Sequence, residues 1–464
     1  MKAVILAGGK GSRFFPFNYY RPKVMFPVCN KPILEHILDV LCKCNISDVI
    51  LVIGYRGARI KNYFGNGARV NCRIIYVEQK DPLGTADALL KAEHLIKDEW
   101  FLCIYADNLF PHEALQNLLS FWRNVKEKER VHGIVMLSKV KEPWRHSTVA
   151  LKDNKIQRIA WKARKGHYPS DLALTGVFIF NQEIFPYLER ASGIIQEVEN
   201  GVIPPEEYDI IDSLNTLTSE GGTIYGNITE HWWIDVNYPW ETFIANKLTF
   251  KEMNKKLTET YIHEEACVSD RAKIEGNVFI DKGATVEENV HIRGPVWIGK
   301  NTKVLNGSYI RGPTIIGNDC VIGPYAEVSG CIGNRVKIGH CAEVSGTILD
   351  YTWIVHYCHI SGIIGERVDI GAGTIVGTLR FDDESAKVII RGIPVNTNWL
   401  GNCAFIGDYC RTGVGAMIMP GRIIGPGSMV GPGVMVMKNI PPFKLVLRKE
   451  EVEIRDWRPE IYDK

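Results

Sequence analysis

The sequence predicts an α/β domain followed by a parallel β-helix, because its hydrophobic periodicity changes near residue 262. Before this point, short apolar runs alternate with stretches of helical spacing, a pattern typical of a mostly parallel sheet flanked by helices. After it, aliphatic residues recur at every sixth position. That period is typical of a β-helix whose coils each hold three short strands. A chain of 464 residues is also too long for one compact domain.

Six apolar runs in the first half have the length and composition of buried strands. The segments 33–44 and 85–96, which lie between such runs, carry apolar residues at helical spacing. We therefore expect the α/β domain to occupy residues 1–245. The six expected strands are Val4–Ala7, Val49–Gly54, Ile74–Val77, Phe101–Tyr105, Ile134–Leu137 and Val177–Phe180.

The six-residue period of the second half is regular enough to predict its structure in detail. Valine or isoleucine occupies every sixth position from Val268 to Val328. The same step continues after four-residue shifts as far as Val376, and a second tract runs from Leu400 to Val436. We therefore expect one inward aliphatic residue on each side of every coil, stacked above its counterpart in the coil before.

Interruptions of this pattern set the remaining boundaries. Residues 246–262 have the character of a connecting helix, so the β-helix is expected over 263–440. The period is broken at 381–399, which predicts a loop extruded from the β-helix. Residues 441–464 are polar and rich in charge, so we expect them to leave the β-helix as a tail.

Composition narrows the classes of function. Lys and Arg number 55 against 53 Asp and Glu, a net charge of +2, so no large field favours nucleic acid or an anionic membrane as a partner. The apolar run at the N-terminus is too short for a signal peptide. The 12 cysteines lack paired Cys-x-x-Cys spacing, so we expect neither a zinc site nor a disulfide framework. A reducing cytoplasm is the compartment that fits this cysteine usage best.

A glycine-rich loop follows the first expected strand, from Ala7 to Arg13. Glycines at a strand-to-helix turn let backbone N–H groups approach a polyanion, and Arg13 and Lys23 can neutralise the charge of phosphates. The loop is not a Walker A motif, and Phe14 stands where Gly-x-Gly-x-x-Gly requires its third glycine. A plain glycine turn with a solvated arginine and lysine is the alternative interpretation.

The loop resembles the signature of the sugar-phosphate nucleotidyltransferases, Gly-x-Gly-Thr/Ser-Arg followed by Pro and by Pro-Lys, which matches Gly9–Pro16 and Pro22–Lys23. Residues 78–89 are similar to the Pro-Leu-Gly-Thr-Ala stretch that lines the nucleobase in that family. The resemblance implies a Rossmann-like nucleotidyltransferase domain that joins an NTP to a sugar 1-phosphate and releases pyrophosphate. The nucleotide-binding residues that it implies are Leu6, Ala7, Gly8, Gly9, Gly11, Gln79, Gly84 and Thr85.

Two aspartates resemble the magnesium ligands of the same family. Asp107 follows an expected strand, and Asp235 lies much later in the chain. Mg²⁺ is bound by carboxylates at strand ends together with substrate phosphate oxygens. Either aspartate alone is more simply explained as a helix cap or a turn residue, but both match the family pattern. The expected catalytic set is therefore Asp107 with Arg13 and Lys23.

The expected sugar-phosphate site departs from the family at one position. Lys162 stands where the family's lysine holds the sugar phosphate, and Gly176 follows in the matching stretch, but Trp161 replaces a glutamate that accepts hydrogen bonds from sugar hydroxyls. Leu174 stands where enzymes for N-acetylglucosamine carry asparagine, which favours a substrate of the glucose 1-phosphate type. Gln79 favours UTP or dTTP, and a GTP-dependent mannose-1-phosphate guanylyltransferase is the alternative.

The second half resembles the left-handed parallel β-helix family, whose members usually trimerise through flat faces, so a homotrimer or hexamer is expected. Residues 369–382 are similar to bifunctional uridylyltransferase/acetyltransferase proteins, especially archaeal ones. That similarity implies His356 as the general base of an acetyl transfer that uses acetyl-CoA. The tyrosine and asparagine partners of that base are replaced by His359 and Thr378. Polar side chains on exposed coil edges are the alternative explanation of these histidines.

A non-catalytic regulatory or scaffold paralogue is the alternative reading of the entire chain. Such a protein would use the same two-domain shape for assembly alone. A scaffold has no reason to retain the full set of phosphate-binding and metal-binding residues, so their joint presence favours an enzyme. That set is Arg13, Lys23, Asp107, Lys162 and Asp235.

Overall fold

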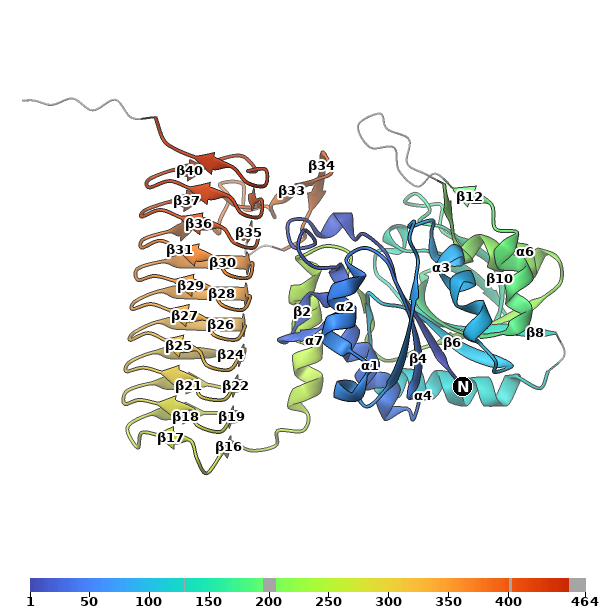
Figure 1. Ribbon diagram of the computed structural model, residues 1–464, viewed down its shortest axis with the longest axis horizontal. Helices are drawn as coiled ribbons and strands as arrows, with labels where there is room; N and C mark the ends of the chain where they lie inside the picture. Colours follow the sequence, from blue (N-terminus) through green and yellow to red (C-terminus); the bar gives the residue numbers. More distant parts are fainter. Residues whose placement is uncertain (129, 195–205, 400–402, 450–464) are drawn as a thin grey trace, which may run out of the picture.

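The computed structural model describes residues 1–128, 130–194, 206–399 and 403–449. It contains an α/β domain in the first half and a prism of stacked coils in the second half, packed side by side (Figure 1). The predicted fold class, a Rossmann-like domain followed by a left-handed parallel β-helix, is confirmed. In the described ranges, no helix has both the length and the apolar character needed to cross a membrane.

A nine-stranded sheet forms the centre of the α/β domain, with the order β5-β4-β1-β6-β11-β8-β14-β10-β9. The six expected strands are all present, and β1, β4, β5 and β6 are mutually parallel. The sheet is mixed, because β11 runs antiparallel to both of its neighbours, β6 and β8. The strands are β1 (Ala3–Ala7), β4 (Asp48–Ile53), β5 (Arg73–Glu78), β6 (Trp100–Tyr105), β8 (Val131–Lys139), β9 (Thr148–Lys152), β10 (Lys155–Ala160), β11 (Leu172–Asn181) and β14 (Thr223–Ile228).

Helices cover both faces of this sheet, because apolar side chains alternate between the faces of each buried strand. One hydrophobic cluster joins Ile5 and Leu51 to α1 (Ile33–Lys43), α2 (Gly57–Phe64) and α4 (His112–Val125). The opposite cluster joins Val4 and Val52 to α3 (Thr85–Ala92), α5 (Phe185–Glu189) and α6 (Ile210–Ser219). Both helices predicted at 33–44 and 85–96 are therefore present.

Stacked coils form the β-helix, with the aliphatic ladder inside. Early coils contain eighteen residues, since Ile298 lies opposite Ile316, and the middle coils contain sixteen, since Ile316 lies opposite Ile332. Coils after residue 404 contain eighteen again, since Ile406 lies opposite Ile424. The four-residue shifts in the sequence therefore mark shortened coils. Ile298, Ile316 and Ile332 are all fully or almost fully buried in one continuous core. The strands are β16 (Tyr261–Ile262), β17 (Cys267–Val268), β18 (Lys273–Glu275), β19 (Val278–Ile280), β20 (Thr285–Val286), β21 (His291–Arg293), β22 (Val296–Ile298), β23 (Lys303–Val304), β24 (Tyr309–Ile316), β25 (Val321–Ile322), β26 (Glu327–Ile332), β27 (Lys337–Ile338), β28 (Glu343–Ile348), β29 (Trp353–Ile354), β30 (His359–Ile364), β31 (Asp369–Ile370), β32 (Ile375–Val376), β35 (Ala404–Ile406), β36 (Arg411–Thr412), β37 (Met417–Ile418), β38 (Ile423–Ile424), β39 (Met429–Val430), β40 (Met435–Val436) and β41 (Leu445–Val446).

The connecting helix differs from its predicted bounds of 246–262. Helix α7 runs from Glu241 to Asn254, and Tyr261–Ile262 already pair with Phe279–Ile280 of the next coil. The Glu241 carboxylate accepts hydrogen bonds from the backbone N–H groups of Asn237 and Tyr238, so it holds the chain that leads into the first turn.

Two other segments also differ from the sequence-based expectations. The segment 381–399, expected as a loop extruded from the β-helix, contains an antiparallel hairpin of β33 (Lys387–Ile390) and β34 (Ile393–Asn396). The tail does not leave the β-helix at residue 441, because Val446 extends the ladder above Val430. Residues 450–464 of the predicted tail, and Leu400 at the start of the second tract, lie outside the described residues.

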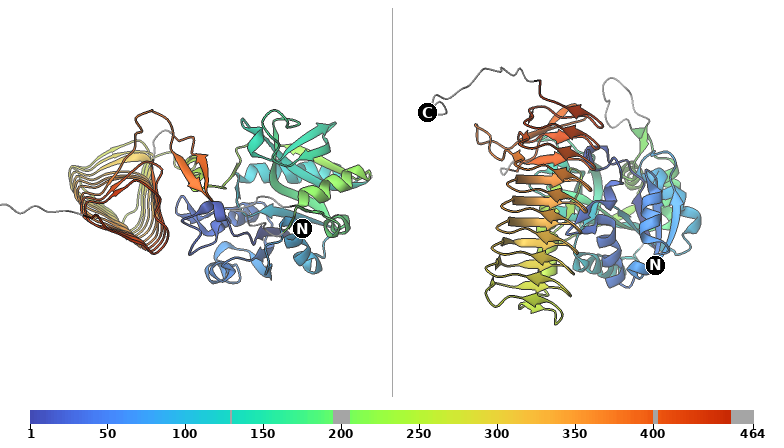
Figure 2. Two further views of the ribbon diagram at one scale, coloured as in Figure 1. Left: turned by 90° about the horizontal axis from the view of Figure 1, so that it is seen from above. Right: turned by 60° about the vertical axis from the view of Figure 1, so that its left-hand side comes forward.

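A shared hydrophobic core joins the two domains. Phe14, Phe17 and Phe26 of the α/β domain belong to the same buried cluster as Ile363 and Phe405 of the β-helix. The view along the β-helix axis shows the triangular prism with one face toward the α/β domain (Figure 2). The chain near the glycine loop is therefore packed directly against the second domain.

Candidate functional site

The glycine loop leaves β1 with a backbone that is closely packed at two positions. A Cβ on Gly8 would lie 2.6 Å from the Gln79 Oε1 atom, and a Cβ on Gly11 would lie 2.8 Å from the Lys23 Cβ atom. Gly11 also has a φ of +57°, which favours glycine. A Cβ on Gly9 would meet no atom within 4 Å, so the backbone there borders open space. This is the geometry that a loop needs to admit a phosphate chain.

The two predicted metal ligands are brought together by a short strand pair. β15 (Ile234–Asp235) pairs antiparallel with β7 (Asn108–Leu109), so that Asp235 lies opposite Asn108, the residue after Asp107. The Asp107 carbonyl accepts a hydrogen bond of 2.9 Å from the Val236 N–H group. Residues more than a hundred positions apart therefore share one edge of the domain.

Lys23 completes this edge from the opposite side. Its Nζ atom lies 2.6 Å from the Asp107 Oδ2 atom, and the Asn108 side chain donates to Asp107 Oδ1 at 3.1 Å. Lys23 stands at the start of a short 3-10 helix, Lys23–Met25, whose Val24 and Met25 side chains are buried. The buried neighbours fix the backbone of Lys23, so its ammonium group is directed to the carboxylates.

Asp235 has an environment that favours a bound cation. Burial raises the pKa of its carboxyl to about 6, and the Asp107 charge acts in the same direction. Its Oδ2 atom accepts a hydrogen bond of 2.6 Å from the Asn237 side chain and lies 3.7 Å from His146 Nδ1. Burial lowers the pKa of His146 to about 4, so this ring is neutral near pH 7.

These residues fit a magnesium ion held partly by substrate. Both donors are carboxylate oxygens, the ligands that Mg²⁺ prefers. Within the part of the chain that the structure describes, no cluster of three or more His, Cys, Asp or Glu side chains forms a complete metal cage. A cation between Asp107 and Asp235 would need further oxygen ligands, and the phosphates of a nucleotide would supply them.

The predicted nucleobase residues form a braced turn. The buried Gln79 side chain donates from Nε2 to the Gly84 carbonyl at 3.0 Å and to the Asp87 carboxylate at 2.8 Å. Both contacts use the N–H groups of Nε2, so Oε1 is the amide atom left to accept a hydrogen bond from a base edge. Gly84 has a φ of +103°, and a Cβ there would lie 2.3 Å from the Tyr208 carbonyl oxygen. The role of Gln79 in selecting a pyrimidine therefore stays a prediction.

Thr85 connects this turn to a carboxylate that the sequence interpretation missed. Its hydroxyl hydrogen-bonds to Asp209 Oδ1 at 3.1 Å and accepts from the Ile210 N–H group at 3.0 Å. Asp209 also caps α6 by accepting from the Ile211 N–H group. An aspartate directly before a run of apolar residues is a helix-cap signal, so the cap was detectable from the sequence. Its proximity to Thr85 was not.

The predicted sugar-phosphate lysine lies near the same carboxylates. The Lys162 charge acts to lower the pKa of Asp235, Asp209 and the unpredicted Glu207, which places Lys162 among the acidic groups of the site. Lys162 has a positive φ of +32° at the end of β10. This backbone conformation is uncommon for a residue with a side chain and is often found at functional sites.

Gly176 lies at an irregular register of β11 with β8, next to Tyr105 and Asn108. Its φ is +77°, and a Cβ there would lie 2.7 Å from the Tyr105 ring and 2.8 Å from Asn108 Nδ2. The Trp233 indole donates to Asn108 Oδ1 at 2.9 Å and to the Thr175 carbonyl at 3.1 Å. Gly176 is thus required for close packing beside Asp107, and Leu174 is buried in the core.

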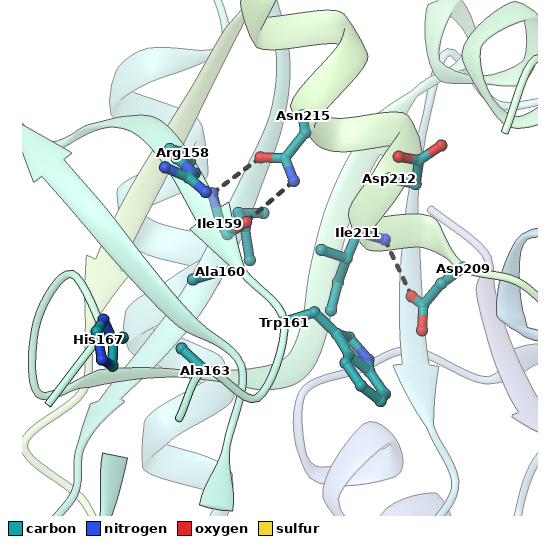
Figure 3. Close-up of a pocket in the computed structure, with 10 residues that line it drawn as sticks. All are labelled: Arg158, Ile159, Ala160, Trp161, Ala163, His167, Asp209, Ile211, Asp212 and Asn215. Carbon is teal, nitrogen blue, oxygen red and sulfur yellow. Dashed lines mark hydrogen bonds between the residues drawn. The ribbon is translucent and has the colours of Figure 1, made fainter. Parts of the chain in front are cut away.

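A cavity of about 290 Å³ adjoins the Lys162 segment, between β10 and α6 (Figure 3). Trp161 and Asp209 line the cavity, together with Asn215, whose amide bonds to the backbone N–H and carbonyl of Ile159. The Trp161 ring points toward the Asp209 side of the cavity in Figure 3. None of the predicted phosphate-binding or metal-binding side chains lines it.

The predicted acetyl-transfer base lies far along the β-helix, on an exposed corner. The His356 ring centroid is 5.3 Å from that of Tyr357, and the His340 ring centroid is 5.1 Å from the same tyrosine. His359 has other partners, since its Nδ1 atom is 3.0 Å from the Val376 carbonyl and its Nε2 atom is 3.7 Å from Glu343. Among the described residues, no carboxylate forms an ion pair with His356, so its role as a base stays a prediction.

Comparisons with known proteins agree with this arrangement. The family model "Nucleotidyl transferase" matches residues 2–247, and the model "Bacterial transferase hexapeptide (six repeats)" matches residues 295–330. A bifunctional protein GlmU from Methanococcus maripaludis strain C7 is 35% identical over 91% of this chain and 91% of its own length.

Two further relatives cover one or both domains. A bifunctional sugar-1-phosphate nucleotidylyltransferase/acetyltransferase from Sulfurisphaera tokodaii is 30% identical over 91% of this chain and 93% of its own length. A glucose-1-phosphate thymidylyltransferase from Streptomyces antibioticus is 29% identical over 59% of this chain and 73% of its own length. The similarity to the first relative therefore extends through the β-helix, whereas the similarity to the second covers a shorter region.

Proposed function

Because this chain belongs to the nucleotidyl transferase family, we propose that it transfers a nucleotidyl group from an NTP to a sugar 1-phosphate and releases pyrophosphate. The observation that carries the proposal is the contact between Lys23 and Asp107 beside Asp235, at the end of a glycine loop open at Gly9. Phosphate-binding cations and metal-binding carboxylates meet there, as transfer between two phosphates requires.

In the proposed reaction, an oxygen of the sugar 1-phosphate attacks the α-phosphorus of the NTP. The new bond joins this oxygen to the α-phosphorus, and the bond from the α-phosphorus to the oxygen that bridges to the β-phosphate breaks. Pyrophosphate leaves with the bridging oxygen, and no covalent intermediate with the protein forms. Arg13 and Lys23 stabilise the charge that develops on the phosphates, and Lys162 holds the sugar phosphate.

Asp107 and Asp235 are the residues that would hold Mg²⁺. When bound, the ion supplies positive charge next to the α-phosphate and the leaving pyrophosphate. Two asparagine side chains orient these carboxylates: Asn108 donates a hydrogen bond to Asp107, and Asn237 donates one to Asp235. The Lys23 ammonium group contacts the same Asp107 carboxylate. It can therefore also contact a phosphate that binds next to Asp107.

The substrates are inferred from fewer residues. We propose UTP or dTTP as the nucleotide, from Gln79 in the base-lining turn, and a sugar of the glucose 1-phosphate type, from Leu174. The relative from Streptomyces antibioticus, a glucose-1-phosphate thymidylyltransferase, supports this choice. GTP with mannose 1-phosphate is the alternative pair. The bifunctional name of the Sulfurisphaera relative supports acetyl transfer from acetyl-CoA to an amino sugar phosphate, with His356 as base.

The β-helix is also proposed to assemble the protein into a homotrimer or hexamer. A prism with flat faces buries little of its outer surface by itself, and large aromatic side chains such as Trp353 and Tyr357 are at least half exposed on it. The non-catalytic scaffold remains the competing interpretation, in which assembly is the only function.

The experiment that tests this proposal is a substrate grid with pyrophosphate release as the readout. UTP, dTTP, GTP, ATP and CTP are each combined with glucose, mannose, glucosamine and N-acetylglucosamine 1-phosphates in the presence of Mg²⁺. We expect one clearly preferred pair, within the UTP or dTTP rows and the glucose column. Asp107→Asn is the matched control, because it removes a metal-binding charge without changing the size of the side chain. Silence of the wild type across the grid would favour the scaffold.

A further inference from the structure

The hairpin β33–β34 is an extension of the β-helix that packs against the α/β domain. Figure 1 and the view from above in Figure 2 both place it between the prism and the dark-blue chain that follows β1. Val388 and Ile390 of β33 are 0% and 5% exposed, in the same hydrophobic cluster as Phe14 and Phe17. Phe14 directly follows Arg13, so the hairpin shares its core with the phosphate-binding loop.

The hairpin ends in a tight turn that fixes the direction of its tip. Ile390 pairs with Ile393, which leaves Arg391 and Gly392 as a two-residue loop. Both loop residues have positive φ, +51° for Arg391 and +78° for Gly392, as a type I′ turn requires. An arginine is unusual at such a position, because a side chain there strains the backbone. Burial of Ile390 next to the turn then holds the tip at the domain boundary.

The charge of Arg391 reaches the predicted site. Burial raises the pKa of Glu207, the Asp209 charge raises it further, and three cations lower it: Arg13, Arg391 and Lys162. Arg13 and Lys162 are the residues predicted to bind the NTP and the sugar phosphate. The tip of the hairpin therefore lies within electrostatic range of the same carboxylate as both predicted phosphate-binding side chains.

We propose that Arg391, supplied by the β-helix, binds phosphate oxygens of the NTP and so completes the nucleotidyl-transfer site across the domain boundary. A guanidinium group presents a planar fork of donors that matches phosphate geometry. In the absence of nucleotide, Glu207 offers this cluster of cations a local negative charge. A triphosphate carries more charge than one carboxylate, so it competes for the same cations when it enters.

This inference rests on the proposed function and adds one consequence to it. Affinity for the NTP depends on the second domain, although the family signature lies entirely in the first. The hairpin packs through Val388 and Ile390, so the position of Arg391 depends on the domain interface. The inference assigns Arg391 to the NTP, whereas Lys162 is assigned to the sugar 1-phosphate.

The test compares Arg391→Ala with Lys387→Ala in the full-length protein. Lys387 is a matched control, since it is an exposed cation on the same hairpin, four residues from the tip. Loss of a charge-assisted hydrogen bond to phosphate should weaken NTP binding by about tenfold or more. We expect Arg391→Ala to raise the KM for the NTP to that extent and to leave the KM for the sugar 1-phosphate within about twofold. Lys387→Ala should leave both constants unchanged.

Two further measurements separate this inference from the proposed function. Calorimetric titration with the NTP alone measures binding without turnover, and Arg391→Lys should recover only part of the affinity, because an ammonium group lacks the planar fork. Wild-type NTP affinity in Arg391→Ala, with an unchanged melting temperature, would overturn the inference even if the wild type turns over. A wild type that binds the NTP but releases no pyrophosphate would overturn the proposed function instead.

Discussion

A buried ion pair between the domains gives the sharpest prediction about stability. Arg21 Nη2 lies 2.9 Å from Asp408 Oδ1 and 3.0 Å from Glu366 Oε2. The Arg21 side chain is 5% exposed and that of Asp408 is 0% exposed. Asp408→Ala would leave the Arg21 guanidinium buried at the interface and, among the residues that the structure describes, paired only with the carboxylate of Glu366.

The expected cost follows from burial of the charge. Removing one member of a buried pair typically costs about 3–5 kcal/mol, and the remaining contact with Glu366 favours the lower end, about 3 kcal/mol. Arg59 provides the matched control, because it lies 3.3 Å from the same Glu366 while its side chain is 42% exposed. Exposed pairs contribute little, so Arg59→Ala should cost less than about 1 kcal/mol.

A double variant distinguishes the cost of leaving one charge unpaired from the net contribution of the ion pair to stability. Among the described residues, Arg21 Nη1 and Asp408 Oδ2 have no hydrogen-bond partner, so the pair is incompletely satisfied. Replacing both charges, as in Arg21→Met with Asp408→Leu, should therefore recover most of the stability lost in Asp408→Ala. Urea denaturation followed by tryptophan fluorescence measures the wild type and the three variants. An Asp408→Ala protein within about 0.5 kcal/mol of the wild type would refute the assigned burial of this pair.

Three further predictions follow from single residues. Gly84→Ala should raise the KM for the NTP, because its Cβ would lie 2.3 Å from the Tyr208 carbonyl and the φ of +103° is unfavourable for alanine; wild-type kinetics would contradict the assignment of this turn. Burial lowers the pKa of His36 from 6.5 to about 4. As the pH falls from 6.5 through 4, the free energy of unfolding should therefore decrease by about 3 kcal/mol, because the unfolded chain binds the proton more readily than the folded one. Melting curves of His36→Gln should lack that component, and an identical pH dependence would refute it. Ile348→Ala, at a fully buried position of the ladder, should cost about 2–5 kcal/mol in denaturant titrations, whereas a change near zero would mean that the ladder is loosely packed.

The periodic parts of the fold were predictable because one physical rule governs each of them. Buried parallel strands must be apolar along their length, so the run at Val49–Gly54 indicated β4 directly. The six-residue period of aliphatic residues indicated the inward positions of the β-helix. The shortened coils correspond to the four-residue shifts in that period. The pairing of Val430 with Val446 was missed because the segment 441–464 is rich in charge as a whole, although Val446 and its neighbours Leu445 and Leu447 are aliphatic.

The domain interface was not predictable, because its partners are far apart in sequence and follow no period. Arg21 and Asp408 are each unremarkable in their local sequence, and only the fold brings them to 2.9 Å. The hairpin at 381–399 was read as a loop for a similar reason. Its alternating pattern covers only four residues on each strand, and Arg391–Gly392 is not one of the common hairpin turns.

For the candidate site, the sequence suggested a set of residues but not their geometry. A resemblance in the glycine loop suggested Arg13 and Lys23, and a resemblance at a strand end suggested Asp107; their roles stay predictions. The pairing of β7 with β15, which brings Asp235 to Asp107, involves strands of two residues each, too short to recognise in a sequence. Glu207 and Asp209 carried no family signal, and burial of their surroundings became apparent only in the structure.

The central claim, direct transfer of a nucleotidyl group, is tested most directly by following the α-phosphate. The protein is incubated with Mg²⁺, the preferred sugar 1-phosphate and an NTP labelled on its α-phosphate, and the products are separated after a single turnover. The account predicts that all converted label appears in an NDP-sugar, with an equal amount of pyrophosphate and none on the protein, and that Asp107→Asn slows this conversion by orders of magnitude. Label released as a nucleoside monophosphate or attached to the protein, or full activity of Asp107→Asn, would contradict it.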